Sequence, residues 1–187
     1  MLSYAPGLTF GANFSKGVGL AWHFKPIDIW YGFKVNKDIP RPLFVGAYFI
    51  TDYNWQLYPE LQSGHMFWWS SFELGPKLFY KIPIKEKLLK LSFSTSLVGW
   101  TSRPTPSTET HFYSLKFSDF VNNPHSNLTF GSSLQFNHTH IEIEFQNRPN
   151  KKFSIAYAFQ YFAMYETPKI SQITHSIHLK WRIGKMK

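Results

Sequence analysis

Cysteine is absent from the 187-residue chain, which excludes disulfides, zinc–thiolate centres, iron–sulfur clusters and cysteine nucleophiles together. Charged residues are also scarce, at 17% against about 25% in ordinary soluble domains. No apolar run reaches the ~20 residues that a membrane-spanning helix needs. Residues 1–6 show neither the basic start nor the apolar core of a signal peptide, so an exported chain would have to be processed or truncated.

Aromatic residues, by contrast, are abundant: 19 Phe, 10 Tyr and 7 Trp make up 19% of the chain. So many rings suit either a lipid-facing band with aromatic girdles or a large surface for an aromatic ligand. The formal net charge of +9 suits anionic lipid and the phosphates of lipopolysaccharide. Nucleic acid is not an expected partner, because the basic residues are scattered and no RNP-like motif or Gly-rich phosphate loop is present.

The dominant pattern is an alternation of apolar and polar residues with a period of two, which predicts β-strands. Pro26 is expected to break one strand, and residues 83–86 form a tight hairpin turn. Residues 122–125 and 147–150 are expected turns, and no stretch shows a helical period over a dozen positions. The predicted strands are residues 8–14, 18–24, 27–35, 43–55, 66–82, 89–97, 110–121, 128–136, 140–146, 153–165 and 173–183.

Many strands without helices must hide their edges in a sandwich or in a closed barrel. We predict a single all-β domain over residues 1–187: an antiparallel up-and-down β-barrel of about 10–12 strands, transmembrane, with a polar surface loop region at about 101–126. Several strands reach the ~9–11 residues needed to cross a bilayer. Their polar faces are rich in Ser, Thr, Gly, Asn and Gln, whereas a water-facing surface would carry more Lys and Glu.

Large rings near the strand ends are expected to form the interfacial aromatic belt of such a barrel. These residues are Trp22, Trp55, Trp68, Trp69, Trp100, Tyr165 and Trp181. The alternative is that these rings fill the core of a soluble sandwich.

Three segments resemble small uncharacterised outer-membrane β-barrel proteins of the Bacteroidetes type. They are the run Glu73-Leu74-Gly75-Pro76-Lys77-Leu78, the hairpin that leads to Trp100-Thr101-Ser102-Arg103-Pro104, and residues 175–185. The likeness is one of style over the whole chain and includes no catalytic motif. It implies an outer-membrane location and a final strand like the terminal strand of such barrels, although Lys185-Met186-Lys187 follows where many relatives end on an aromatic residue.

Polar residues on the predicted inner faces are the candidates for function. We expect the lumen to hold Glu73, Lys77, Lys90, His140, Glu142, Glu144, Lys180 and Arg182, whose charges must pair in a narrow barrel. Ser176, His178 and Glu142 are weak candidates for a catalytic set, since a His can activate a Ser and a carboxylate can orient the His. His138, His140 and Glu142 match a metal-ligand set in type only, so we expect neither metal nor cofactor.

The sequence thus predicts an integral protein of the bacterial outer membrane that is not an enzyme. Envelope structure, adhesion and passage of a small solute are the possible roles. Its partners would be membrane lipid, lipopolysaccharide and other envelope proteins. Two alternatives stay open: an outer-membrane hydrolase of lipid or lipopolysaccharide, and a soluble β-barrel that binds a hydrophobic ligand.

Overall fold

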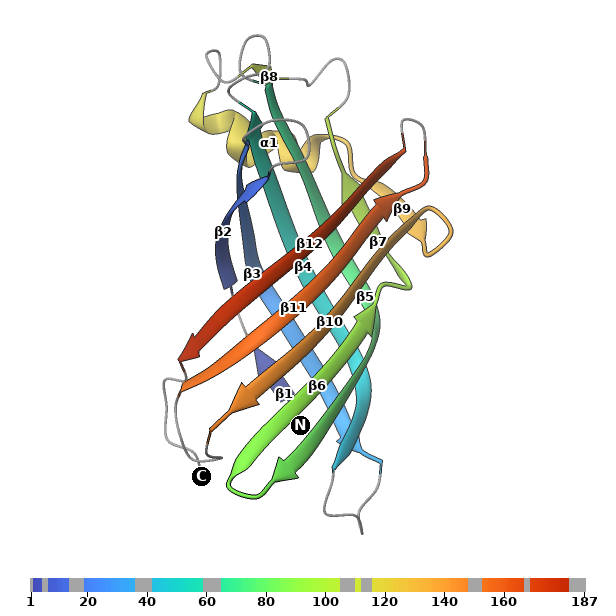
Figure 1. The fold of residues 1–187 in the computed structure, drawn as a ribbon. Coiled ribbons are helices and arrows are strands. Elements are labelled where there is room, and N and C mark those ends of the chain that lie inside the picture. Colours follow the sequence, from blue (N-terminus) through green and yellow to red (C-terminus); the bar gives the residue numbers. More distant parts are fainter. Residues whose placement is uncertain are drawn as a thin grey trace.

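The computed structural model describes residues 2–4, 7–13, 19–35, 42–58, 65–104, 110–111, 116–147, 153–166 and 169–181. In these residues the chain is one antiparallel β-sheet with a single helix at one end (Figure 1), which confirms the all-β antiparallel class. The strands are β1 (Leu2–Tyr4), β2 (Gly7–Asn13), β3 (Gly19–Lys34), β4 (Leu43–Tyr58), β5 (His65–Ile84), β6 (Lys87–Thr95), β7 (Val98–Ser102), β8 (Thr110–His111), β9 (Thr129–Ser132), β10 (Phe136–Gln146), β11 (Phe153–Met164) and β12 (Ile170–Trp181). The helix is α1 (Phe117–Ser126).

The twelve described strands form eight antiparallel passes of the chain. Strand β3 pairs with both β1 and β2. Strand β5 pairs with β6, β7 and β8. On the next pass, β9 pairs with β7, and β10 pairs with β6. Each group therefore occupies one place in the sheet, and the order of passes is β1–β2, β3, β4, β5, β6–β8, β9–β10, β11 and β12. The strand number of a barrel is its number of passes, so the described residues provide eight strands where about ten to twelve were expected.

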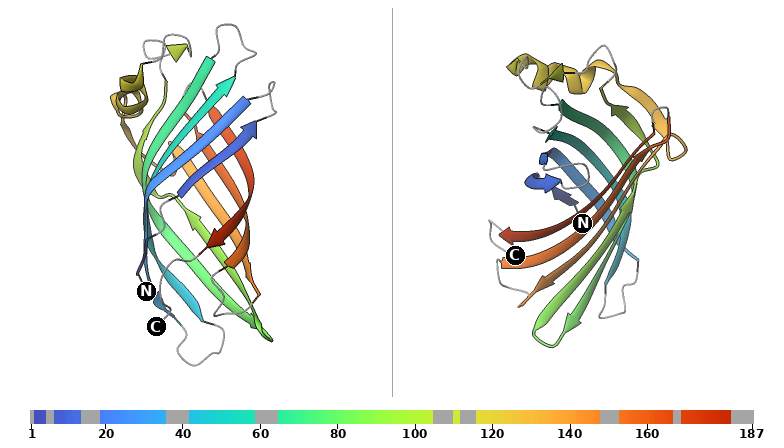
Figure 2. Two further views of the ribbon diagram at one scale, coloured as in Figure 1. Left: turned by 90° about the vertical axis from the view of Figure 1, so that its left-hand side faces the viewer. Right: turned by 45° about the horizontal axis from the view of Figure 1, so that its top comes forward.

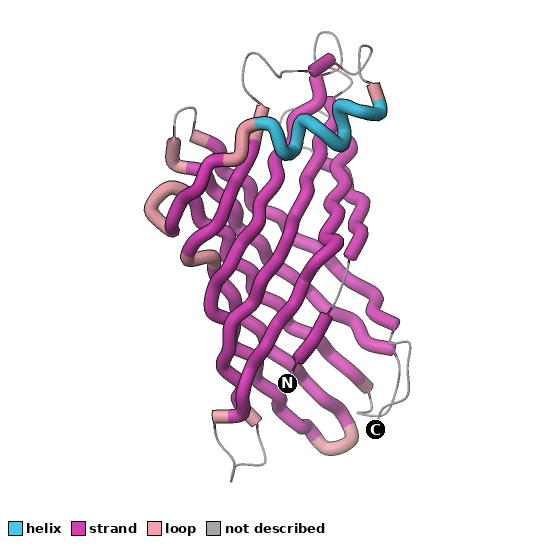
Figure 3. Tube along the Cα trace, turned by 180° about the vertical axis from the view of Figure 1, so that it is seen from behind, coloured by secondary structure: helices cyan, strands magenta, loops and turns pink. Residues whose placement is uncertain are grey.

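The sheet curls into a half-barrel, with β1–β2 along one edge and β12 along the other (Figure 2). Seen from behind, the strands near the viewer and those behind them slant in opposite directions, as expected of a curled sheet (Figure 3). No hydrogen-bonded pairing joins β12 to β1 or β2 within the described ranges. Side chains nevertheless meet across the concave side, since Gln172 Oε1 accepts hydrogen bonds from Gln56 Nε2 at 2.9 Å and from Trp69 Nε1 at 3.1 Å.

The two faces of this sheet have opposite chemistry. Apolar side chains point away from the concave side: Ile177 and Leu179 on β12 are 76% and 70% exposed, and Phe93 and Ile143 are exposed on β6 and β10. The alternate residues, such as Ser94 and Glu144, are buried. On β10 and β12 the described apolar side chains that the alternation assigned to the outside are thus exposed, apart from buried Phe136. An exposed apolar surface of this extent is unusual for a monomer in water.

Pro26 does not end a strand, so the predicted break between residues 24 and 27 is wrong. β3 runs through it, and its register against β4 shifts between Phe24 and Ile27. Even-numbered residues such as Phe24 are exposed before this β-bulge, and odd-numbered ones such as Ile29 after it. A bulge suits proline because the ladder is already interrupted there, and the Ile27 amide donates to Thr51 Oγ1 at 3.2 Å instead.

Helix α1 occupies the end of the segment that we expected to form a strand (110–121) and all of the expected turn (122–125). Of the described residues in the predicted strand, Thr110–His111 is extended. At its start the Lys116 amide donates to Asp119 Oδ2 at 2.8 Å, and the Asp119 amide donates to the Lys116 carbonyl. Tertiary contacts hold its other end, where Ser70 Oγ donates to the Pro124 carbonyl at 2.5 Å. The ten residues place Phe117, Phe120 and Val121 at helical spacing but include Pro124. A helix this short depends on tertiary packing for its stability.

The hairpin between β5 and β6 is confirmed, with its turn at Lys85 and Glu86. Lys85 has a φ of 53°, in the left-handed region that non-glycine residues seldom occupy. The predicted turn at 147–150 lies largely outside the described residues. The predicted loop region at about 101–126 contains the end of β7, β8 and α1 where it is described, and its residues 105–109 lie outside the described part.

Candidate functional site

Glu73 is one of two described charged groups, with Asp52, that have none of their surface exposed. Its Oε1 atom lies 2.9 Å from His138 Nδ1 and also accepts a hydrogen bond from Ser71 Oγ. The His138 backbone amide donates to Ser96 Oγ at 2.8 Å. The pair therefore links β5 to β10 across the concave side and satisfies one carboxylate oxygen inside the protein.

A second group of charges lies further along the concave side and joins β6, β10 and β12. Lys90 Nζ lies 2.5 Å from Glu144 Oε1, and Lys180 Nζ lies 2.5 Å from Glu142 Oε1. Lys180 also lies 3.8 Å from Glu144 Oε2, so the four side chains form a continuous chain of alternating charge. Burial of these charges is tolerable because each one faces a partner.

Aromatic side chains occupy much of the remaining space. Trp69 stacks on Phe162 with ring centroids 3.9 Å apart and an angle of 6°, and His138 meets both rings edge-on. Towards the end with the β5–β6 turn, a second cluster consists of Trp30, Tyr48 and Ile50, packed against partly buried Phe44 and Phe79. The concave side is thus a packed interior.

The sequence-predicted inner residues all take positions on the concave side where the structure describes them. Glu73, Lys90 and Glu144 are buried, while Lys77, His140, Glu142 and Lys180 are partly buried, and Arg182 lies outside the described residues. Sequence reasoning missed Asp52, which is fully buried 3.4 Å from Lys25 Nζ. The two faces of the predicted strand 43–55 are indistinct in the sequence, so the only local signal for this pair is the alternation of β3 before its bulge, which turns Lys25 inwards.

Ser176, His178 and Glu142, the weak catalytic candidates, do lie together. Ser176 Oγ is 2.8 Å from His178 Nε2, and His178 Nδ1 is 3.9 Å from Glu142 Oε2. The order of atoms is that of a serine–histidine–carboxylate triad, although the last separation exceeds a hydrogen bond and Glu142 also pairs with Lys180. All three side chains are partly buried, on the edge strand β12 and on β10.

The predicted interfacial belt is wrong for three of its members, because Trp55, Trp68 and Trp69 are buried. Trp69 is one of the alternate residues of β5 that face the concave side, as Glu73 does. Trp55 and Trp68 form an outer cluster with Met66, beside Tyr53, whose ring meets His125 of the unforeseen helix α1. This packing buries rings that the alternation placed on an open surface.

The other members of the predicted belt differ in exposure. Trp22 is partly buried and stacks on Trp55 at 6.3 Å. Trp100 and Tyr165 are exposed, whereas the side chain of Trp181 lies outside the described part of the structure.

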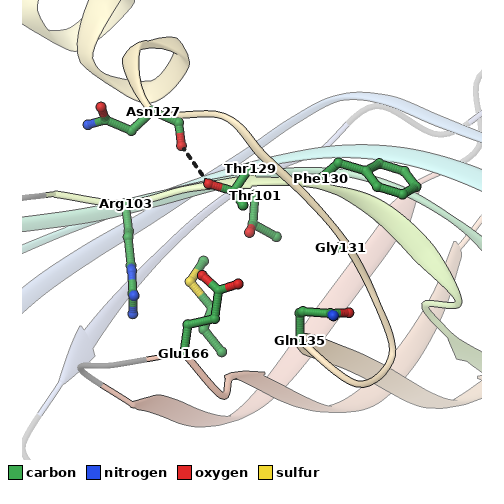
Figure 4. Close-up of a pocket in the computed structure, with 9 residues that line it drawn as sticks. Thr101, Arg103, Asn127, Thr129, Phe130, Gly131, Gln135 and Glu166 are labelled. Atoms are coloured by element: carbon green, nitrogen blue, oxygen red, sulfur yellow. Dashed lines mark hydrogen bonds between the residues drawn. The ribbon is translucent and has the colours of Figure 1, made fainter.

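A small hollow opens near the end of the sheet that bears α1 (Figure 4). The charged side chains of Arg103 and Glu166 both reach it, and the Thr129 hydroxyl donates to the Asn127 carbonyl at 3.5 Å. It is lined by Thr101, Arg103, Asn127, Thr129, Phe130, Gly131, Gln135, Met164 and Glu166.

No group of three or more His, Cys, Asp or Glu side chains gathers in a metal-binding arrangement in the described residues. His138 pairs with Glu73, and Glu142 pairs with Lys180, so the suggested set of His138, His140 and Glu142 is divided between other contacts.

Comparison with protein-family models, with curated proteins and with solved structures finds no match to this chain. Within the described residues, no helix has both the length and the apolar character to cross a membrane.

Proposed function

We propose that this chain is an integral protein of the bacterial outer membrane, in which the curled sheet closes into a transmembrane β-barrel. The observation that supports this most strongly is that apolar side chains lie outside and polar side chains inside, the reverse of a soluble protein. Isoleucine, leucine and phenylalanine side chains are exposed, while glutamate, lysine, histidine and serine side chains are buried on the concave side. This distribution suits lipid outside and a polar interior.

The number and length of the passes also favour a barrel in a membrane. Eight is an even number, so β12 would run antiparallel to β1–β2 and could close the ladder. An eight-stranded barrel has an interior just wide enough for side chains to fill, as the stacked Trp69 and Phe162 do here. β3, β4 and β5 have 16, 16 and 20 residues, more than the ~9–11 that span a bilayer.

The two ends of the sheet differ in a way that supports an orientation. The β5–β6 turn and the final residues of β12 lie towards one end, and α1 lies at the other (Figure 1). Outer-membrane barrels have short periplasmic turns and longer extracellular loops. We assign the end with α1 to the cell exterior, where it would meet lipopolysaccharide or other envelope proteins.

A packed interior favours a structural or adhesive role in the envelope over passage of a solute. Fractionation of cells tests the assignment: the protein should stay with outer membranes after alkaline carbonate extraction. It should also run differently on gels before and after boiling. Recovery as a monomer in detergent-free buffer would reject it in favour of a soluble barrel that binds a hydrophobic ligand.

The contact of Ser176 with His178 favours a second candidate, hydrolysis of carboxylic esters of membrane lipid. Ser176 Oγ would bond to the ester carbonyl carbon while its proton passes to His178 Nε2. The same proton would move to the departing alcohol as the ester C–O bond breaks, and water would then release the acyl group.

The assay for this candidate is release of fatty acid from phospholipid or lipopolysaccharide by folded protein in vesicles. Ser176→Ala should abolish the release, and Ser154→Ala, a buried inner-face change on β11, should leave it intact. Equal rates in the wild type and Ser176→Ala would eliminate the hydrolase.

A further inference from the structure

A short turn projects sideways from the wall of the sheet between β9 and β10 (beside the label β9 in Figure 1). β9 pairs with β7 and β10 pairs with β6, and the residues between them, Ser133–Gln135, have no partner in the ladder. The Ser133 amide donates to the Leu97 carbonyl at 2.9 Å, and the Gln135 carbonyl accepts from the Tyr165 amide at 2.8 Å. We call residues Ser132–Gln135 the lateral turn.

Apolar side chains gather on and beside the lateral turn. Leu134 is 82% exposed, the highest exposure among the large apolar side chains described. Phe130 and Trp100 lie next to it on the outer parity of β9 and β7, and their rings meet edge-on with centroids 5.2 Å apart. Leu97 and Phe130 are also more than half exposed.

The backbone amides of the lateral turn all find acceptors inside the protein. The Ser132 amide donates to Gln135 Oε1 at 2.8 Å, and the Gln135 amide donates to the Ser132 carbonyl at 2.9 Å. The Leu134 amide donates to Ser132 Oγ at 3.3 Å, and Ser132 Oγ itself donates to Gln135 Oε1 at 2.6 Å. With the bond from Ser133 to Leu97, no amide from 132 to 135 depends on water.

These two observations together point to one surrounding medium. In water, an exposed turn has no need to satisfy its amides internally, and an exposed leucine at its tip gains nothing. In lipid, every backbone donor must be satisfied within the protein, and apolar side chains are favoured. A neighbouring tryptophan is typical of the boundary between acyl chains and head groups.

We propose that the lateral turn inserts into the lipid of the outer leaflet and anchors the wall of the protein at a fixed depth. This rests on the proposed membrane location. The ligand class is the acyl-chain region of a bilayer, with Leu134 immersed and the indole of Trp100 near the head groups.

The absence of native cysteine allows a direct test, because a single introduced thiol carries the only label. Leu134→Cys is labelled with the fluorophore NBD, and the protein is folded into phosphatidylcholine vesicles that contain nitroxide-labelled lipid. Ile177→Cys reports on the wall itself, and Ser126→Cys, exposed on α1, is the matched control away from the lateral turn. Folding of each variant is checked by the shift between boiled and unboiled samples on a gel.

The expected result is blue-shifted emission at 134 that nitroxide lipid quenches as strongly as at 177, with soluble iodide quenching neither. Quenching at 177 but iodide access at 134 would overturn the lateral anchor and leave the membrane barrel standing. Iodide access at both positions would reject the proposed function as well. Emission at 134 that is blue-shifted but insensitive to nitroxide lipid would indicate contact with protein, and would equally overturn the proposal.

Discussion

Replacement of Ile177 by arginine separates a lipid-facing wall from a water-facing one. Ile177 lies in the middle of β12, its side chain is 76% exposed, and its partner across the ladder is Tyr157 on β11. An arginine there meets no packed core and leaves no cavity. Any large loss of stability must therefore come from the medium outside the protein.

The expected magnitude differs between the two media. At an exposed site in water the substitution should change the free energy of unfolding by no more than ~0.5 kcal/mol. On the lipid face near the middle of a bilayer, arginine costs about 2–4 kcal/mol, and less towards the interfaces. We expect the larger value, because Ile177 shares its outer face with exposed Leu179 next to it and with exposed Ile173 beyond His175.

The assay is guanidinium-induced unfolding of protein folded into phospholipid vesicles, followed by tryptophan fluorescence. Ile177→Ala measures the loss of the side chain alone, and Ser126→Arg measures the effect of a charge on α1. The stability of Ile177→Arg should fall well below that of Ile177→Ala, while Ser126→Arg stays near the wild type. Equal stability of the arginine and alanine variants at 177 would refute the reasoning.

Two further predictions concern the interior and the close packing of strands. Lys90→Met alone should lower the free energy of unfolding by about 3–5 kcal/mol, because Glu144 keeps a buried charge without its nearest partner. The double variant Lys90→Met/Glu144→Leu should recover most of that stability. Additive losses in the double-mutant cycle would contradict this. Gly46→Ala would place a Cβ 2.0 Å from the Tyr31 carbonyl oxygen. We therefore expect the free energy of unfolding to fall by about 1–3 kcal/mol or more, with a weaker band of the compact, folded protein on unboiled gels. An unchanged band would contradict this and show that the strands can move apart.

The period-two alternation was sufficient to predict most strands and to assign their two faces. The hairpin of β5 and β6 and the alternating faces of β10, β11 and β12 all follow from local sequence. Even at Pro26 the parity of the apolar residues changes in the sequence, from Phe24 to Ile27, and a bulge is the structure that keeps both sets outside. The strand was read as broken because proline usually ends a ladder.

Features that depend on distant contacts could not be read in the same way. Helix α1 has ten residues, too few for its helical spacing of Phe117, Phe120 and Val121 to stand out over a dozen positions. It is held by Ser70 and Tyr53, which lie 54 and 72 residues before the helix residues that they contact. Without α1, no local signal distinguishes a buried Trp68 from an interfacial one. Composition could predict rings at the strand ends, but not the packing that buries them.

In the candidate site, too, some features follow from local sequence and others depend on distant contacts. Lys90, Glu142, Glu144 and Lys180 were predicted to face inwards from their parity alone. Which lysine meets which glutamate depends on the register between β6, β10 and β12, which no strand encodes by itself. The contact between His138 and Glu73 crosses from β10 to β5, strands that are not neighbours in the sheet, so it required the curl of the sheet as well.

The most direct test of a lipid-facing outer surface is a nitroxide scan along β12 from residue 171 to residue 179, with one introduced cysteine at a time. Collisions with oxygen, which concentrates in the bilayer, should rise at 173, 175, 177 and 179 and fall at the even positions between them. A water-soluble nickel chelate should reach none of these four positions. Uniform access of the chelate along the strand, or an oxygen maximum at the even positions, would contradict a wall whose apolar side faces lipid.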